Sequence, residues 1–248
     1  MTAIPFPLSP LFLAVIETEL KITGKIGSSN LVQWLRFMKI TKYGHCCLLI
    51  EENGVRILTD PGTYSDQQES ALNIHIILIT HEHSDHLHIE SLKKVLLNNP
   101  QAKIITNSAV GVKLKIENIN FVIVEDGQSL VEENILFEAF GTQHAVMHSS
   151  LTPTSNTGYF IANKLFYPGD ALTNPHRPIE ILALPVAGPW IKVSEAVDYA
   201  LSLKPKVCFP VHDGILKHLG SAHSVPLRVL TENGIKFQVL EINSENLV

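Results

Sequence analysis

The sequence predicts an α/β fold in which β-sheets stack on one another and helices cover their outer faces. Short runs rich in β-branched residues follow one another from Met38 onward, whereas helical periodicity appears in only a few places, each after several such runs. Many strands followed by helices that cover them are typical of a layered architecture. With 248 residues the chain can form one large domain or two small ones with a sizeable core.

The runs that predict strands have the length and residue types of buried or half-buried sheet positions. Between two of them, Asn53-Gly54 is typical of a tight β-hairpin turn. The predicted strands are residues 38–51, 55–59, 75–80, 103–106, 120–124, 135–141, 158–166, 179–186, 206–210 and 235–242.

Helices are predicted in the segments with helical apolar spacing. Residues 88–98 carry such spacing and are followed by Pro100, which helps to end a helix. Residues 194–203 begin with a serine that can cap a helix, and they also have one apolar face. A last helix is predicted over residues 226–232, where Gly234 follows as a stop signal.

The sequence pattern changes near Met38, from an irregular stretch to short β-branched runs that alternate with turns. We therefore divide the chain into an N-terminal extension (residues 1–37) and one domain (residues 38–248). The extension is apolar over residues 5–16. This stretch is too short to span a membrane, and no basic segment precedes it as in a secretory signal. We therefore expect a loosely ordered extension and no membrane partner.

Charge and cysteine content indicate the compartment and exclude some partners. The formal net charge of -5 and the lack of a basic cluster argue against a nucleic-acid partner. Three cysteines, Cys46, Cys47 and Cys208, cannot form a disulfide framework, which favours a reducing, cytoplasmic location. None lies beside the histidine-rich segment described next, so we expect small buried side chains rather than metal-binding thiolates.

One histidine-rich segment predicts a metal site. The apolar run over residues 76–80 reads as a buried strand, and it leads directly into the segment His81-Glu82-His83-Ser84-Asp85-His86. Imidazole and carboxylate ligands together suit zinc, manganese or iron, and no thiolate is needed. Three histidines and an aspartate within six residues at a strand end are therefore the strongest functional signal in the chain.

Further candidate ligands follow other predicted strands, at the positions where sites collect in layered folds. Asp60, His144, Asp170 and His212 each lie at or just after a strand end. His144 and His148 compete for one position, and we prefer His144 because it is nearer the strand end. His148 then lines the pocket or supports the ligands. We expect His45 to be a structural or surface residue.

The order of these motifs from Met38 to the C-terminus resembles the five motifs of the metallo-β-lactamase superfamily, which implies a four-layer αββα sandwich. The resemblance implies that His81, His83 and His144 hold one metal and that Asp85, His86 and His212 hold a second. Asp170 would bridge the two, and Asp60 would hydrogen-bond within the histidine-rich loop and orient it. The segments Asp60-Pro61-Gly62, Tyr167-Pro168-Gly169-Asp170 and Pro210-Val211-His212-Asp213-Gly214 look most similar to the branch of ascorbate-6-phosphate lactonase-like proteins.

This resemblance implies a metal-dependent hydrolase with two divalent metal ions, zinc first and manganese or iron as alternatives. A hydroxide bound between the metals would attack a small ester, lactone, thioester, amide or phosphodiester, with Asp85 and Asp170 as the catalytic carboxylates. The alternative is a non-hydrolytic protein on the same fold, either an iron redox module or a ligand-binding sensor. We expect a small-molecule substrate, and a homo-oligomer is compatible with the sequence.

Overall fold

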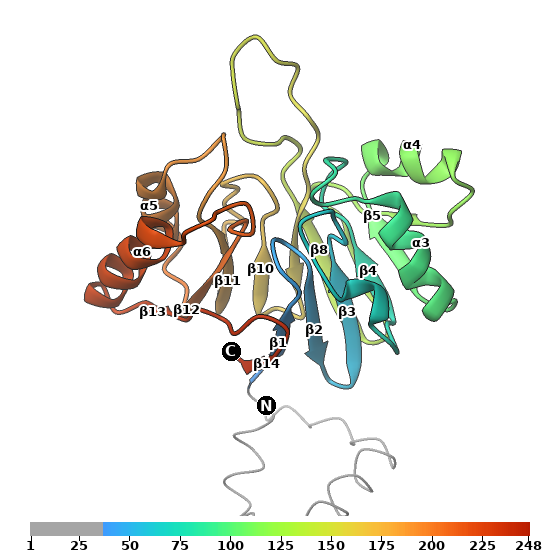
Figure 1. Cartoon of the computed structure of the whole chain (residues 1–248), viewed down its shortest axis with the longest axis horizontal. Coiled ribbons are helices and arrows are strands. Elements are labelled where there is room, and N and C mark those ends of the chain that lie inside the picture. Colours follow the sequence, from blue (N-terminus) through green and yellow to red (C-terminus); the bar gives the residue numbers. More distant parts are fainter. Residues whose placement is uncertain (1–36) are drawn as a thin grey trace, which may run out of the picture. The chain divides into compact units, whose positions relative to one another are not determined.

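The computed structural model describes residues 37–248; the extension predicted for residues 1–37 lies outside the described residues except for Phe37. The described residues form two seven-stranded sheets and four α-helices. One sheet has the order β14-β1-β2-β3-β4-β5-β6, and the other has the order β13-β12-β11-β10-β9-β8-β7. Figure 1 shows the sheets side by side, with α3 and α4 beyond the first sheet and α5 and α6 beyond the second.

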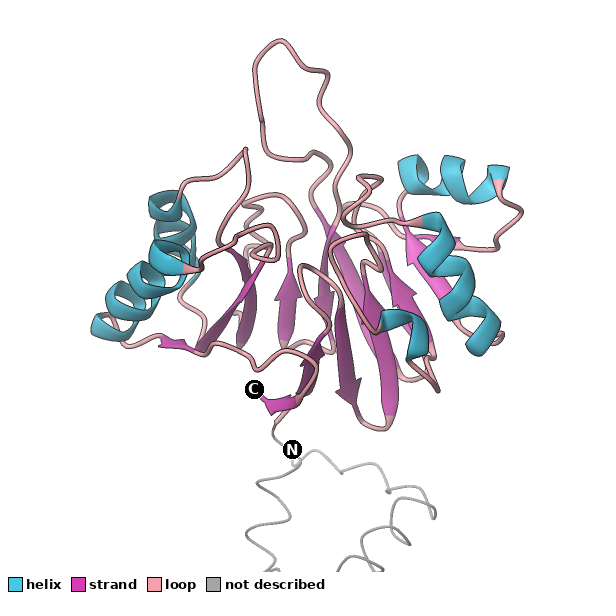
Figure 2. Cartoon of the chain, viewed as in Figure 1, coloured by secondary structure: helices cyan, strands magenta, loops and turns pink. Residues whose placement is uncertain are grey.

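The first sheet and its helices consist of β1 (Lys39–Lys42), β2 (Leu48–Glu52), β3 (Val55–Thr59), β4 (Ile76–Leu78), β5 (Lys103–Thr106), β6 (Val122–Ile123), β14 (Glu245–Leu247), α3 (Ile89–Asn98) and α4 (Ser108–Ile116), with a 3-10 helix η1 (Gln68–Ser70) between β3 and β4. The second sheet and its helices consist of β7 (Ser129–Glu132), β8 (Ile135–Phe140), β9 (Gly158–Ile161), β10 (Leu165–Tyr167), β11 (Ile181–Pro185), β12 (Val207–Val211), β13 (Lys236–Phe237), α5 (Val193–Leu203) and α6 (Gly220–Glu232). The distribution of strands and helices is drawn in Figure 2.

Three layers of buried apolar side chains hold this arrangement together. The central layer joins the two sheets, with Ile57 and Ile76 from the first and Phe137 and Phe209 from the second. A second layer packs α5 and α6 on the second sheet, and a third packs α3 and α4 on the first. Each fully buried aromatic or branched side chain contributes about 1.5–3 kcal/mol. The predicted αββα sandwich is therefore confirmed.

Local sequence explains where several strands end. The turn Asn53-Gly54 joins β2 to β3, and both residues have the positive φ (52° and 80°) that a two-residue hairpin turn requires. The predicted strand over residues 38–51 is divided into β1 and β2. The break falls at Gly44, whose φ of +123° and close approach to the Tyr64 carbonyl (2.7 Å from an added Cβ) exclude other residues.

The structure corrects two helix predictions. The sequence does not predict a helix over α4, because β-branched residues and Gly111 interrupt the helical signal of this segment. Gly111 is needed there, since an added Cβ would lie 2.7 Å from the Phe121 ring. Helix α6 begins at Gly220 rather than Pro226, which lies inside it. Among the described residues, no helix is both long and apolar enough to cross a membrane.

Candidate metal centre

The predicted ligands gather where strands of both sheets end. β3 runs parallel to β4, and β10 runs parallel to β11 and β11 to β12, so the loops that follow these strands lie at one edge of each sheet. Asp60 follows β3, Asp170 follows β10 and His212 follows β12. The loop after β8, which contains His144, rises above the sheets in Figure 1. Topology therefore brings together residues that are more than a hundred positions apart.

One group of potential ligand atoms comes from His81, His83, His144 and Asp170, whose donor atoms all lie within 4.8 Å of one another. His81 Nε2 is 3.1 Å from His83 Nδ1, and His144 Nε2 is 3.3 Å from Asp170 Oδ2. His83 is half-buried and the other three residues are buried. This group unites the residues predicted for the first metal with the predicted bridging aspartate.

A second group comes from Asp85, His86, Asp170 and His212, again with donor atoms within 4.8 Å of one another. His86 Nε2 lies 3.1 Å from Asp170 Oδ1, and His212 Nε2 lies 2.8 Å from Asp170 Oδ2. Asp85 Oδ2 is 3.5 Å from His212 Nε2. Asp170 is the member that the two groups share, and its two carboxylate oxygens face ligands from both.

Hydrogen bonds determine which ring nitrogens stay free. Asp60 is fully buried and accepts from the Thr80 backbone N–H (2.8 Å), the Thr80 hydroxyl (2.8 Å) and His86 Nδ1 (2.7 Å). Because the Thr80 hydroxyl donates to Asp60, its oxygen can accept from His81 Nδ1 at 3.0 Å. His144 Nδ1 donates to the Ala145 carbonyl at 2.6 Å. The Nε2 atoms of these three histidines therefore carry lone pairs that face the centre.

Several of the facing atoms have no hydrogen-bond partner. His86 Nε2, Asp170 Oδ1 and both ring nitrogens of His212 are buried and unpaired. Leaving a buried polar atom unpaired costs about 1–3 kcal/mol of folding free energy, so a cluster of such atoms indicates a site for a bound ligand or ion. The unpaired atoms are nitrogen and carboxylate oxygen atoms, which bind divalent metal ions. The residues present thus fit the metal ions that the sequence predicts.

The charge states of Asp170 and His81 suit metal binding as well. Burial would raise the pKa of Asp170, but the charge of His86 and the nearby imidazoles of His144 and His212 outweigh burial and hold this pKa well below its ordinary value. Burial lowers the pKa of His81 well below its ordinary value, and His86 adds to the effect. An ionised carboxylate and a neutral imidazole are the forms that coordinate a metal.

Two glycines are required by close approaches at the site. A Cβ at Gly62 would lie 1.8 Å from the Asp85 carbonyl oxygen, so the loop after β3 touches the histidine-rich loop directly. Gly169 has a φ of +63°, and a Cβ there would lie 2.3 Å from Asn156 Oδ1. Asn156 Oδ1 also accepts from the Asp170 backbone N–H at 3.0 Å. The glycines that precede the ligand segments are therefore part of the site.

His148 does not join either group. It lies exposed on the loop after β8, where its Nδ1 is 2.8 Å from Ser150 Oγ. It lines only a small cavity of about 20 Å³ within that loop. The structure therefore does not bring His148 to the cluster as a supporting residue, because the chain turns away after His144.

Two residues that sequence reasoning left out lie in the centre. His45 is fully buried, and its Nε2 is 3.3 Å from Asp85 Oδ2. Burial lowers the pKa of His45, but Cys46 and the nearby Asp85 carboxylate outweigh it and raise this pKa to about 9. The Cys46 thiol lies within 4.8 Å of ligand atoms of His45, His86 and His212. All three cysteines are buried, as predicted, and the prediction that none of them binds a metal stays a prediction for Cys46, which lies beside these histidines.

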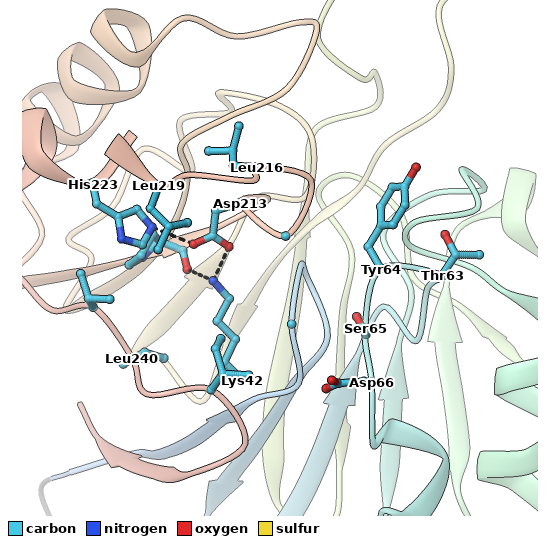
Figure 3. A pocket seen from close by; sticks show the side chains of 15 residues that line it. Lys42, Thr63, Tyr64, Ser65, Asp66, Asp213, Leu216, Leu219, His223 and Leu240 are labelled. Atoms are coloured by element: carbon cyan, nitrogen blue, oxygen red, sulfur yellow. Dashed lines mark hydrogen bonds and ion pairs between the residues drawn. The ribbon is translucent and has the colours of Figure 1, made fainter. Parts of the chain in front are cut away.

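An aromatic side chain and a cavity flank the centre. The Trp190 ring lies 5.5 Å from the rings of both His144 and His212. A cavity of about 520 Å³ adjoins the loop after β12, and Figure 3 shows Asp213 of that loop between two partners in its wall. Asp213 accepts from Lys42 Nζ (2.5 Å), and its other oxygen lies 2.8 Å from His223 Nε2.

Comparison with known proteins agrees with this geometry. The family model described as a beta-lactamase superfamily domain matches residues 39–212. Protein Rv0786c of Mycobacterium tuberculosis is 37% identical over 184 residues, which cover 72% of this chain and 85% of that protein. A UPF0173 metal-dependent hydrolase of Staphylococcus saprophyticus, SSP1060, is 23% identical over 205 residues, which cover 71% of this chain and 85% of that protein.

A solved structure shows the same fold. Igni18, a metallo hydrolase from the hyperthermophilic archaeon Ignicoccus hospitalis, superimposes with a TM-score of 0.68 and 18% identity over 86% of this chain and 98% of that chain. The branch of ascorbate-6-phosphate lactonase-like proteins stays a prediction, whereas the superfamily is confirmed. The chain belongs to the metallo-β-lactamase superfamily, and it is a metal-dependent hydrolase.

Proposed function

We propose that the chain is a hydrolase with two metal ions. The observation that supports this most directly is that two ligand groups share Asp170. A structural zinc site uses four ligands and leaves no open position, whereas these groups offer six side chains besides the shared carboxylate. The first metal would be held by His81, His83 and His144, the second by Asp85, His86 and His212, and Asp170 would bridge them.

The donor set favours zinc in this proposal. Imidazole nitrogens and carboxylate oxygens bind zinc in catalytic sites, and they also accept manganese and iron. No thiolate is required, although Cys46 lies beside the second group. Burial would raise the pKa of the Cys46 thiol, but His45, His86 and His212 outweigh burial and lower this pKa to about 6.

Two divalent cations held by these groups would supply an activated water near neutral pH and polarise the bond that is cleaved. The chain's own residues fix the ligand atoms that would hold them. Asp60 keeps a hydrogen on His86 Nδ1, and the Ala145 carbonyl keeps one on His144 Nδ1, so both Nε2 atoms stay available. Asp85 is the most exposed carboxylate of the centre, with 19% of its side chain accessible. We propose Asp85 and Asp170 as the catalytic carboxylates.

The substrate of the proposed reaction is a small ester, lactone, thioester, amide or phosphodiester. Proteins with this fold differ in what they act on. An isothiocyanate hydrolase from Delia radicum gut bacteria has a TM-score of 0.63, and a diphosphatase of the PhnP family has one of 0.62. The fold thus supports hydrolysis of several bond types, and the substrate class has to come from assays.

The alternative function is a redox module with iron in the same ligands, since histidine and carboxylate also suit iron. CmlA, a diiron β-hydroxylase from Streptomyces venezuelae, has a TM-score of 0.62 with this chain. A ligand-binding sensor is the other alternative. A cytoplasmic location, a small-molecule substrate and the lack of a nucleic-acid or membrane partner remain predictions.

Metal analysis of the purified protein, followed by hydrolysis assays on lactones, esters, thioesters and phosphodiesters, tests the proposal. We expect about two zinc ions per chain and hydrolysis of at least one class, lost in Asp170→Ala. One metal ion per chain, or two iron ions with oxygen consumption and no hydrolysis, would contradict it.

A further inference from the structure

His45 lies at the junction between the two loops that carry the second ligand group. It belongs to the connection between β1 and β2, and none of its side-chain surface is exposed. Its backbone carbonyl accepts from the His212 N–H at 3.1 Å, and its ring lies 4.0 Å from the His212 ring. A Cβ at Gly214 would lie 3.0 Å from His45 Cβ. His45 thus packs tightly against the turn that follows β12.

The ring nitrogens of His45 have different partners. Nδ1 accepts from the Gly214 backbone N–H at 3.1 Å, so it must offer a lone pair in that direction. A neutral imidazole with a lone pair on Nδ1 carries its hydrogen on Nε2. Protonation would place a hydrogen on Nδ1 as well, and Nδ1 could then no longer accept from Gly214, so this hydrogen bond requires the neutral ring. Nε2 therefore cannot coordinate a metal ion.

Nε2 lies close to Asp85 and has no hydrogen-bond partner in the described structure. Asp85 Oδ2 is 3.3 Å from His45 Nε2, and the same oxygen is 3.5 Å from His212 Nε2. The other titratable side chains that approach the same ring are Cys46, Tyr64, His86 and His212. Asp85 is accessible to solvent on one side, so a fixed donor on its buried side would restrict how the carboxylate turns. Such donors to a ligating carboxylate raise metal affinity.

We propose that His45 is a positioning residue of the second metal subsite, whose Nε2–H holds the Asp85 carboxylate toward the metal. Its main-chain carbonyl, which accepts from the His212 N–H, meanwhile holds the turn that contains His212. This inference rests on the proposed two-metal function. It assigns to His45 a role in the affinity of the second metal ion and none in that of the first.

Two substitutions separate the two ring nitrogens. His45→Asn keeps an acceptor near the position of Nδ1 and removes the donor to Asp85. His45→Gln places an amide N–H near the position of Nε2 and removes the acceptor for Gly214. His75→Asn is the matched control, because His75 Nδ1 also accepts a backbone N–H, from Arg56 at 3.0 Å, outside the ligand groups.

The full-length, metal-free protein is titrated with zinc in competition with a chromophoric chelator, and the two equivalents are fitted separately. We expect His45→Asn to weaken the second equivalent about 10–100-fold and to leave the first unchanged. His45→Gln and His75→Asn should bind both equivalents within about threefold of the unaltered protein. Circular dichroism on each variant checks that it is folded.

Loss of the second equivalent in His45→Gln with retention in His45→Asn would overturn the proposal, since the bond to Gly214 would then be the one that matters. Unchanged binding in both variants would overturn it as well. If His45→Asn does not fold, the affinity of His45→Gln for the second zinc equivalent is the deciding measurement. A decrease of tenfold or more in that affinity would refute the proposed role of Nε2. Uptake of a single zinc ion by the unaltered protein would instead contradict the two-metal function.

Discussion

Replacing His144 with alanine tests the first ligand group at the position that the sequence left open. His144 is 5% exposed, its Nε2 faces Asp170, and its Nδ1 donates to the Ala145 carbonyl. The variant loses one of the three histidine ligands proposed for the first metal. Removing a hydrogen-bond partner near a ligand already costs about 10–100-fold, so loss of a ligand should exceed the upper value. A 100-fold loss of kcat/KM corresponds to about 2.7 kcal/mol.

The fold should survive this change, because the lost hydrogen bond contributes only about 1 kcal/mol and Phe137 of β8 stays packed in the central layer. His148→Ala is the matched control. It removes an exposed imidazole that hydrogen-bonds with Ser150 and lies outside both ligand groups, so activity and metal content should stay within about twofold. Hydrolysis and bound zinc are measured on both variants. Metal loss in the His148 variant with retention in the His144 variant would refute the assignment.

Further predictions concern the supports of the site and the chain's N-terminal part. Asp60→Asn should weaken binding of the second zinc ion about 10–100-fold in a chelator titration, because the hydrogen bond from His86 Nδ1 to the Asp60 carboxylate is lost; equal weakening of the binding of both ions would count against this. Lys42→Met should lower the free energy of unfolding in urea by about 3–5 kcal/mol, because Asp213 keeps a buried charge without its lysine; a smaller effect would show that water reaches the pair. Removal of residues 1–37 should leave melting temperature and zinc content unchanged, since the described core begins at Met38; an insoluble product would contradict this.

Much of the site could be read from the sequence because its signals are local. The segment from His81 to His86 follows a wholly buried strand, and such a strand has to end in a loop. The motifs around Gly62 and Gly169 are local sequence patterns as well, although the contact that requires each glycine is with another loop, Asp85 for Gly62 and Asn156 for Gly169. Strand ends that carry histidine or aspartate therefore predicted the residues that topology later brings together.

The rest depends on contacts that no local pattern reveals. His45 reaches the centre because its loop meets Gly214, which lies 169 residues further along the chain. Cys46, the next residue, lies beside the same ligand group. His148 has the residue type of a ligand, but the backbone after His144 leaves the site. These outcomes are set by how the two sheets pack, and a single sequence does not show that packing.

The most direct test of the two-metal account is anomalous diffraction at the zinc edge on crystals of the full chain grown with zinc. The account predicts two anomalous peaks about 3.5–4 Å apart, one beside His81, His83 and His144 and one beside Asp85, His86 and His212, with Asp170 between them. A single peak, or two peaks without the Asp170 carboxylate between them, would contradict it.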